Sequence, residues 1–320
     1  MKNFNLLNIF ATGLAKDCQH LSKNPFLLLR KILFLILPIF LISCSDKKSE
    51  SPEAVAEVSP IGGILMPESA YTMRDGRIFV SEIGEFGKDG DGKIVEISLD
   101  GTKKVIADTG LNDPKGIMVE ADTIFVTDNN EVKKVSLSGE VETWLKPDDF
   151  PRKPQFLNDI TIDKNTIIYI SDSGDLLNGN GGGAIFRVDS NKKVSVLVDK
   201  ENDELIRSPN GLSTFQRGYL AFNDFENGGL FRVRLRDMEV EKISDGFGGA
   251  DGLVYSGKYL YLSDWKNGKI WKLDVSKVGS DPVMIKDGMQ GSADIDVTPD
   301  GKYLVIPEMK ANQVVFHPLN

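Results

Sequence analysis

The sequence contains very little cysteine and histidine. Of its 320 residues, two are cysteines and two are histidines. Cys18 and Cys44 both precede residue 45, and His317 is the one histidine that follows it. Ser-His-Asp centres, Cys-His centres and multi-histidine zinc sites all need histidine in the folded part of the chain, so the composition argues against them. It argues equally against a fold held together by disulfides.

Clusters of basic residues are missing as well. Acidic residues outnumber basic ones by 47 to 38, and the formal net charge is −9. A protein that binds nucleic acid needs lysine and arginine gathered on one face to contact the phosphates. The sequence therefore predicts no nucleic-acid partner. With 41% hydrophobic and 27% charged residues, it has the composition of a soluble globular protein with a large core.

The N-terminal region has the features of an export signal. Basic residues precede an apolar run at 32–42, which is too short to cross a bilayer comfortably. The run ends in Leu-Ile-Ser-Cys, which resembles the bacterial lipobox, whose cysteine carries lipid and opens the mature protein. We therefore expect a signal peptide at residues 1–43, lipid on Cys44 and a tether at 44–53. The alternatives are a plain membrane anchor and a buried helix.

The expected product is an exported bacterial lipoprotein on the periplasmic side, held to a membrane through Cys44. Ser45 follows the lipidated cysteine, which resembles the usual rule for sorting to the outer membrane. We expect the protein to be a monomer.

Residues 54–320 repeat one pattern six times. Each copy opens with a similar phrase, and its second residue serves as an anchor: Glu68, Lys115, Asn158, Asn210, Asp251 and Ala293. The anchors are 47, 43, 52, 41 and 42 residues apart, and apolar residues alternate along each copy. This period and this alternation are typical of a four-stranded propeller blade. The sequence therefore predicts an all-β, six-bladed β-propeller.

The sixth copy stops after three strands, at Asn320. An extended segment at 55–61 belongs to no copy and can supply the missing strand. Its pairing with the last blade would remove an open sheet edge, which otherwise invites aggregation. We therefore expect an N-terminal strand to close the last blade.

The anchors begin the innermost strands, so propeller topology places them around the mouth of the central channel. Glu68 and Asp251 are carboxylates, and Asn158 and Asn210 carry amide oxygens. Hard oxygen ligands without sulfur or imidazole favour Ca²⁺ over Zn²⁺ or Cu²⁺. These four residues are the predicted ligands of a divalent metal. The alternative is that they only cap the strand starts by bonding local backbone groups.

A second acidic column closes the second strand of every copy. Its members are Glu82, Asp128, Asp172, Asp224, Asp264 and Glu308. Because the column is the same in all six copies, we expect these acids to make structural hydrogen bonds within each blade.

The order Glu, other, Asn, Asn, Asp, other, with the phrases "PES", "LNDI", "PNGL" and "ADGL", resembles the gluconolactonase and regucalcin (senescence marker protein) family of six-bladed propellers. The resemblance covers nearly all of residues 54–320. It implies that Glu68, Asn210 and Asp251 hold a divalent metal, usually Ca²⁺, with Asn158 beside the metal-bound water and the substrate. It also implies that Asp251 is the general base and that the reaction is hydrolysis of a lactone or related ester.

Two residues depart from the family's pattern. Sugar-lactone members commonly place an arginine two residues before the first asparagine, where this sequence has Phe156. That change leaves a more apolar ester open as the substrate. Lys115 puts an ammonium among the anchors. Three roles are open for it: it opposes a bound cation, it binds a substrate carboxylate, or it turns away and pairs with an acid such as Glu82. We expect Lys115 and Phe156 to line the substrate site.

Two other functions stay open at this point. One is a non-catalytic, membrane-tethered propeller that binds a ligand or a partner protein, and a weaker one is a strictosidine synthase-like propeller. The longest loops between second and third strands, at 84–92 and 174–183, should overhang the ring and set specificity.

Overall fold

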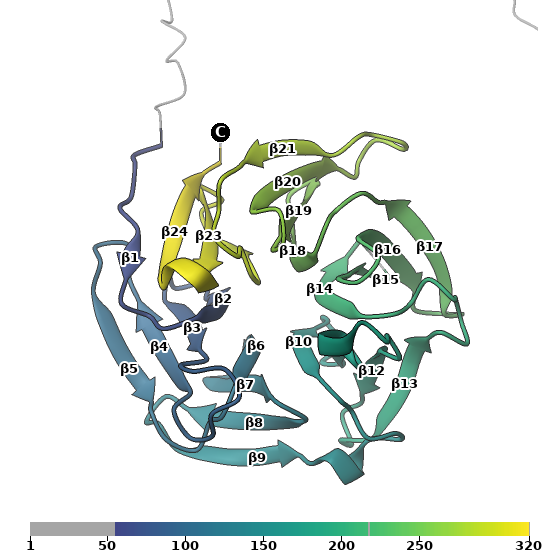
Figure 1. Ribbon diagram of the computed structural model, residues 1–320, viewed down its shortest axis with the longest axis horizontal. Coiled ribbons are helices and arrows are strands. Elements are labelled where there is room, and N and C mark those ends of the chain that lie inside the picture. Colours follow the sequence, from purple (N-terminus) through teal and green to yellow (C-terminus); the bar gives the residue numbers. More distant parts are fainter. Residues whose placement is uncertain (1–54, 217, 320) are drawn as a thin grey trace, which may run out of the picture. The chain divides into compact units, whose positions relative to one another are not determined.

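The structure, a computed structural model, describes residues 55–216 and 218–319. Six four-stranded antiparallel sheets stand around a central axis as the blades of a propeller (Figure 1). This confirms the predicted fold class. The predicted signal peptide, the tether and Cys44 lie outside the described residues.

In each of the first five blades, four strands follow one another from the axis outward. Blade one consists of β2 (Pro67–Thr72), β3 (Ile78–Glu82), β4 (Lys93–Ile97) and β5 (Lys103–Ala107). Blade two consists of β6 (Pro114–Glu120), β7 (Thr123–Asp128), β8 (Glu131–Ser136) and β9 (Val141–Leu145). Blade three consists of β10 (Leu157–Ile162), β11 (Ile168–Asp172), β12 (Ala184–Val188) and β13 (Val194–Asp199). Blade four consists of β14 (Pro209–Phe215), β15 (Tyr219–Asp224), β16 (Gly229–Arg234) and β17 (Glu239–Ser244). Blade five consists of β18 (Ala250–Ser256), β19 (Tyr259–Asp264), β20 (Lys269–Asp274) and β21 (Val283–Lys286).

The sixth blade combines both ends of the propeller. It runs β22 (Asp296–Val297), β23 (Tyr303–Glu308), β24 (Gln313–Pro318) and then β1 (Ile61–Gly62), and Ile61 pairs with Val314. The predicted closing strand is confirmed, although only the last residue of the expected segment and Gly62 pair. The innermost strand is also shorter than expected, because Asp294 bonds to the first blade, although Ser292 and Ala293 before it still pair with β23. There the Asp294 amide donates to the Glu68 carbonyl, and the Ala70 amide donates to the Asp294 carbonyl.

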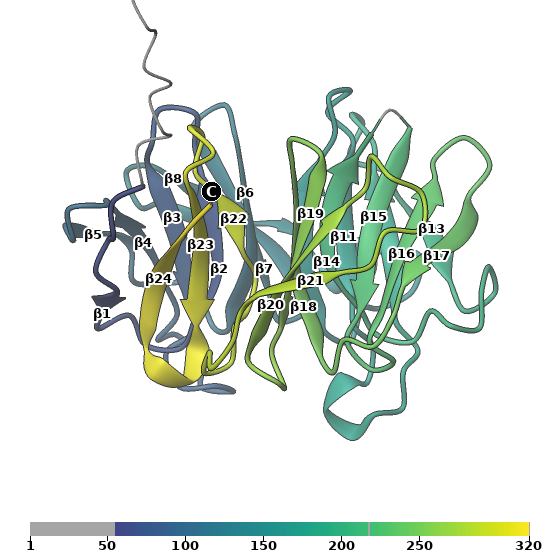
Figure 2. The ribbon, with the colours of Figure 1, turned by 90° about the horizontal axis from the view of Figure 1, so that it is seen from above.

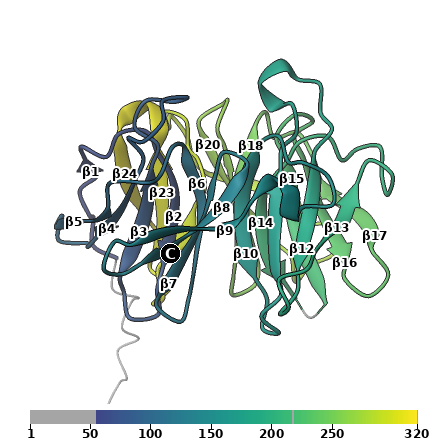
Figure 3. The same ribbon diagram turned by 90° about the horizontal axis from the view of Figure 1, so that it is seen from below.

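The loops of the described chain contain three short 3-10 helices: η1 (Pro147–Asp149), η2 (Leu176–Asn178) and η3 (Met309–Ala311). The helices η2 and η3 follow the second strands of their blades, and both lie on one face of the disc, at the lower edge of Figure 2 and the upper edge of Figure 3. No helix in the described part of the chain is long and apolar enough to span a membrane.

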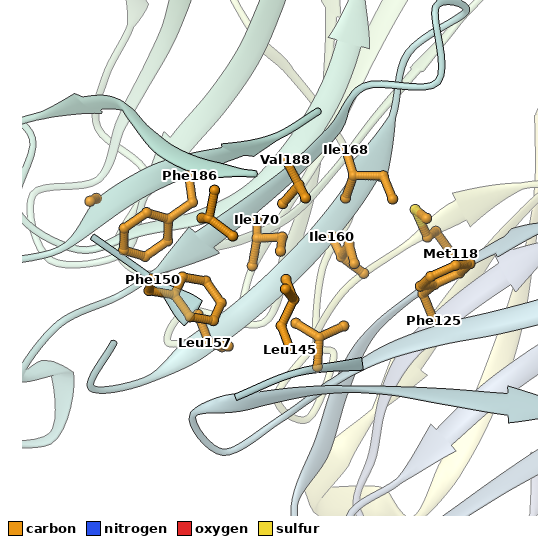
Figure 4. Packing of buried hydrophobic residues seen from close by; sticks show 13 residues of the cluster. Met118, Phe125, Leu145, Phe150, Leu157, Ile160, Ile168, Ile170, Phe186 and Val188 are labelled. Atoms are coloured by element: carbon orange, nitrogen blue, oxygen red, sulfur yellow. The ribbon is translucent and has the colours of Figure 1, made fainter. Parts of the chain in front are cut away.

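Among residues 55–216 and 218–319 the core consists of six apolar clusters, each placed between two neighbouring blades. Figure 4 shows the one between blades two and three, where Met118 and Phe125 face Ile160, Ile168 and Ile170. Alternating apolar residues on both faces of every sheet make this packing possible. Since burial between sheets stabilises each blade only through its neighbours, the ring is stable as a closed unit and holds the innermost strands at fixed positions.

The second acidic column is structural, as expected. The Asp172 carboxylate accepts the amides of Gln155, Phe156 and Gly174, and the Asp224 carboxylate accepts those of Arg207 and Ser208. Asp128, Asp264 and Glu308 accept backbone amides in the same way. Each of these acids thereby fixes the segment that leads into the innermost strand of its own blade. Glu82 differs, because its carboxylate pairs with Lys93 at 2.7 Å.

Candidate functional site

The pairing of the innermost strand shifts register at the anchor in each of the first five blades. The shifts fall between Pro67 and Ala70 in the first blade and between Ala250 and Leu253 in the fifth, with the same pattern in the three blades between. A bulge of this kind bends the strand and re-aims a side chain. The bulge explains how each anchor side chain turns into the mouth of the channel although the strand it begins is otherwise regularly paired.

Glycine after the anchor lets neighbouring innermost strands approach closely. A Cβ on Gly252 would lie 2.5 Å from the Asp294 Cα, and a Cβ on Gly116 would lie 2.5 Å from the Asp159 Cα. Both distances are below any real contact of that type, so these positions require glycine. The small residue beside Asp251 is therefore a condition for bringing the anchors together.

Five of the six anchors line one cavity of about 460 Å³: Glu68, Lys115, Asn158, Asn210 and Asp251. All five are less than 9% exposed. The structure also places Phe156 in this cavity. The sixth anchor, Ala293, is buried and does not line it. The predicted site residues thus share one cavity, and their metal-binding and catalytic roles stay predictions.

The two carboxylates have free oxygens although they are buried. Glu68 Oε2 and Asp251 Oδ1 have no hydrogen-bond partner among the described residues. Burial, and after it the charge of Asp159, raises the pKa of Asp251 to about 8. The pKa of Glu68 is also raised, first by burial and then by Asp251, while Lys115 acts in the opposite direction. A positive charge between the two acids would favour the ionised form of both.

The amides complete the set of oxygen donors. Asn158 Nδ2 donates to the Ser173 hydroxyl at 3.2 Å, which leaves the Asn158 carbonyl oxygen as the group available to the cavity. The Asn210 amide makes no side-chain hydrogen bond to the described residues and is 2% exposed. No three His, Cys, Asp or Glu side chains of residues 55–216 and 218–319 form a metal-binding group. A cation here would therefore need the two amides as well as the two carboxylates, and this donor set fits Ca²⁺.

Lys115 is held at the side of the cavity. Its ammonium donates to the Asp113 carbonyl at 3.0 Å and lies 4.6 Å from the centre of the Phe156 ring. Within the described chain it forms no ion pair, so the pairing with Glu82 considered from the sequence does not occur. Burial lowers the pKa of Lys115, an effect that Glu68 partly offsets. A cation bound by the carboxylates would lower it further.

The residues that support the anchors were not among the predicted site residues. Asn223 precedes the acid that ends β15, and its amide joins two blades. It accepts the Gly211 amide at 3.0 Å and donates to the Asp251 carbonyl at 2.7 Å. Ser81, Thr127, Ser171 and Ser263 occupy the same place in other blades, and each bonds the backbone at an anchor bulge. The sequence feature that marks these residues is a polar residue directly before the acid that ends the second strand, present in five of the six copies.

We expect Asn223→Ala to loosen Asn210 and Asp251 together. The change leaves the Gly211 amide and the Asp251 carbonyl without their partner in a buried place, which costs about 1–3 kcal/mol of folding free energy for each lost group. If the anchors hold calcium, the affinity for it should fall roughly tenfold beyond the effect on stability, because the hydrogen bonds of Asn223 to the backbone set the geometry of the two anchors. Thermal melting with and without calcium measures both.

Asn227→Ala is the matched control, since Asn227 lies in the same blade and bonds the Gly229 amide and the Leu205 carbonyl outside the cavity. Equal loss of the calcium effect in both variants would contradict a positioning role for Asn223.

Most residues of the cavity's apolar wall were not predicted from the sequence either. Immediately after the acid column come Ile83, Phe225, Trp265 and Met309, and all four line the cavity. The register of the repeat contained this information, because the residue after each acid continues toward the same mouth. The predicted overhang of the two long loops is seen in Phe86, Leu176 and Leu177, which also line it.

Solved structures share this fold. A gluconolactonase from Xanthomonas campestris is similar with a TM-score of 0.65 and 13% identity, over 83% of this chain and 91% of that one. A chain of a nidogen/laminin complex is similar with a TM-score of 0.56 and 18% identity, over 68% and 80%. The chain has the fold of a gluconolactonase. No family profile and no curated protein matches the sequence.

Proposed function

We propose that the protein is a divalent-metal-dependent hydrolase, with Ca²⁺ as the metal, that opens a lactone or a related ester. One observation carries the proposal: two buried carboxylates with unpartnered oxygens meet two amides from other blades in a single cavity. The gluconolactonase of similar fold supports the same reaction class. Glu68, Asn210 and Asp251 would hold the metal, with Asn158 beside them.

In this proposal the cavity residues have two roles, which are to bind the metal and to transfer a proton. A bound cation would polarise the substrate carbonyl and offset the negative charge that develops on its oxygen. Asp251 takes a proton from the attacking water, whose oxygen bonds to the carbonyl carbon. The bond between that carbon and the ring oxygen breaks, and the ring oxygen takes up a proton to become a hydroxyl. The product is a hydroxy acid, and no histidine or nucleophilic serine is needed.

Asn158 orients the attacking water in this scheme. Its amide nitrogen is bonded to Ser173, whose hydroxyl donates in turn to the Pro209 carbonyl at 2.9 Å. The side chain is therefore fixed between blades three and four, with its oxygen free to accept from a water.

A panel of lactones and aryl esters, assayed with calcium and with chelator, tests the proposed activity. We expect hydrolysis that requires the metal. If no member of the panel is turned over, the second candidate gains support: a propeller that binds a ligand without reaction. The buried ammonium of Lys115 at the cavity wall favours that candidate for an anionic ligand.

We also propose that the chain is exported and attached to a membrane through lipid on Cys44. The support is the sequence pattern at 32–44 and the direction of the described chain. Ala56 accepts a hydrogen bond from the Tyr303 hydroxyl at the start of β23, whereas the cavity lies at the other end of that strand, near Met309. The attachment would thus leave the cavity open to soluble substrates.

Cys44→Ser should abolish incorporation of radiolabelled palmitate in an expressing bacterium, because the acylated thiol is removed. Ser43→Thr is the control, since it keeps the cysteine. Full labelling of the Cys44→Ser chain would contradict lipidation at this residue.

A further inference from the structure

The cavity has a polar floor and an apolar wall. Glu68, Asn158, Asn210 and Asp251 supply the floor, with Lys115 beside them. The other nine of the fourteen lining residues are apolar. A volume of about 460 Å³ is within the range of small-molecule sites, roughly 300–1,000 Å³, and is larger than a metal and a small ring require.

One side of the wall consists of the two long loops and of Phe156, which precedes β10. Phe86 and Phe156 lie 6.4 Å apart between ring centres, and η2 contributes Leu176 and Leu177. Phe86 is 44% exposed and Leu177 is 70% exposed, although both line a cavity. The η2 loop is braced by Asp175, whose carboxylate accepts from Asn178 at 2.7 Å and from Asn180 at 2.6 Å. An apolar ligand would cover these side chains and gain free energy from the buried area.

The other side offers almost no hydrogen-bonding groups. Phe225 and Trp265 lie 6.2 Å apart between ring centres. The Trp265 indole N–H is already donated to the Met309 sulfur at 3.1 Å. Lys266 and Lys310 lie over the Phe225 and Trp265 rings, and neither lysine lines the cavity.

A polyhydroxylated ligand would therefore place hydroxyl groups against carbon and leave them without partners. The floor can serve one carbonyl and one ring oxygen, and the wall can serve hydrocarbon. We infer that the substrate is an uncharged lactone or ester carrying a large alkyl or aryl substituent, with the reacting carbonyl at the floor and the substituent against Phe86, Phe156, Leu177, Phe225 and Trp265. This inference rests on the proposed hydrolase function and specifies its substrate class.

The test is a chain-length series on the purified full-length protein. The substrates are δ-valerolactone, its 5-alkyl homologues up to δ-decalactone, and D-glucono-δ-lactone, each corrected for spontaneous hydrolysis. We expect kcat/KM to rise about fourfold for each added methylene. D-Glucono-δ-lactone, which has the same ring and polar substituents, should be at least about tenfold poorer than δ-decalactone.

Two variants locate the effect on the exposed part of the wall. Leu177→Ser and Phe86→Ser should each lower kcat/KM for δ-decalactone about tenfold and leave δ-valerolactone within about twofold. Val278→Ser is the matched control, because Val278 is an exposed apolar residue away from the cavity. It should change neither substrate.

The results separate this inference from the proposed function. Hydrolysis that is lost in Asp251→Asn but is independent of chain length would overturn the apolar substrate class and leave the hydrolase. Absence of hydrolysis would overturn the proposed hydrolase function. Binding of δ-decalactone then decides whether the cavity prefers an apolar ligand. Quenching of tryptophan emission by δ-decalactone, absent in Trp265→Phe, would support an apolar ligand, and no quenching would overturn it.

Discussion

Asp251→Asn is expected to remove calcium-dependent hydrolysis, lowering kcat about 10³-fold, while the propeller stays folded. Asparagine has the same shape as aspartate but cannot accept a proton from water, and general bases typically contribute about 10²–10⁴-fold. The substitution also takes one negative charge from the cation's surroundings. The measurement is kcat and KM with saturating calcium, on whichever lactone the wild-type protein hydrolyses best.

The control for this substitution is Asp296→Asn. Asp296 carries a half-buried carboxylate on the innermost strand β22, but this group is bonded to Thr72 and does not line the cavity. We expect its activity to stay within about twofold of the wild type, whatever happens to its stability. Equal activity in wild type and Asp251→Asn would refute the assignment of Asp251 as the base.

The second large effect is a stability that falls as pH rises when calcium is removed. The pKa of Asp251 is about 8 in the folded protein, against an ordinary 3.8, because the carboxyl is buried near Asp159. Between about pH 4 and pH 8 the folded state therefore holds a proton that the unfolded state has lost. Stability contributed by that proton is present below pH 4 and is lost as pH rises toward 8, by up to about 1.4 kcal/mol per pH unit.

Calcium should reverse this dependence. The metal binds the ionised carboxylates of Glu68 and Asp251, so it stabilises the folded state more at pH 8 than at pH 5. At a concentration of 100 times Kd the gain is about 2.7 kcal/mol, which corresponds to roughly 5–10 °C in Tm for a domain of this size. Thermal melts at four pH values, with calcium and with chelator, measure both slopes.

Other groups titrate in the same range, and the variant separates them. The pKa of Asp159 is raised to about 7 and that of Asp296 to about 6, both by burial, and burial lowers the pKa of His317. The difference between wild type and Asp251→Asn cancels the contributions of Asp296 and His317, and it retains that of Asp251 together with its interaction with Asp159. We expect the variant to be more stable than the wild type at pH 8 in chelator. A variant whose melting temperature follows the wild type at every pH would contradict the raised pKa of Asp251.

The repeat made most of the fold predictable. A period of 41–52 residues with alternating apolar positions defines a blade, and six copies with a missing strand define the closure that β1 provides. The anchors could be placed at one mouth because strand direction follows from the meander. The repeat did not predict the departure in the last blade, where Asp294 bonds to β2, since that bonding depends on closing the ring.

The chemistry of the cavity was harder to predict from the sequence than the fold. Glu68 and Asp251 stood out because they break the symmetry of the anchor position. Ile83, Phe225, Trp265 and Met309 did not, because a large apolar residue in an all-β chain is most often core. Their role depends on which way the chain turns after the second strand. The direction of Lys115, toward Asp113 and Phe156, is likewise decided by side-chain packing in three dimensions.

The central claim is that Glu68, Asn210 and Asp251 form a divalent-metal site. Calorimetric titration of the metal-stripped full-length protein with Ca²⁺ at pH 8 tests it most directly, with Asp251→Asn and Asn210→Ala titrated beside the wild type and Asn227→Ala as control. We predict one site per chain in the wild type and the control, and affinity weakened at least about tenfold in both ligand variants. Absence of heat in the wild type, or equal affinity in all four proteins, would contradict the claim.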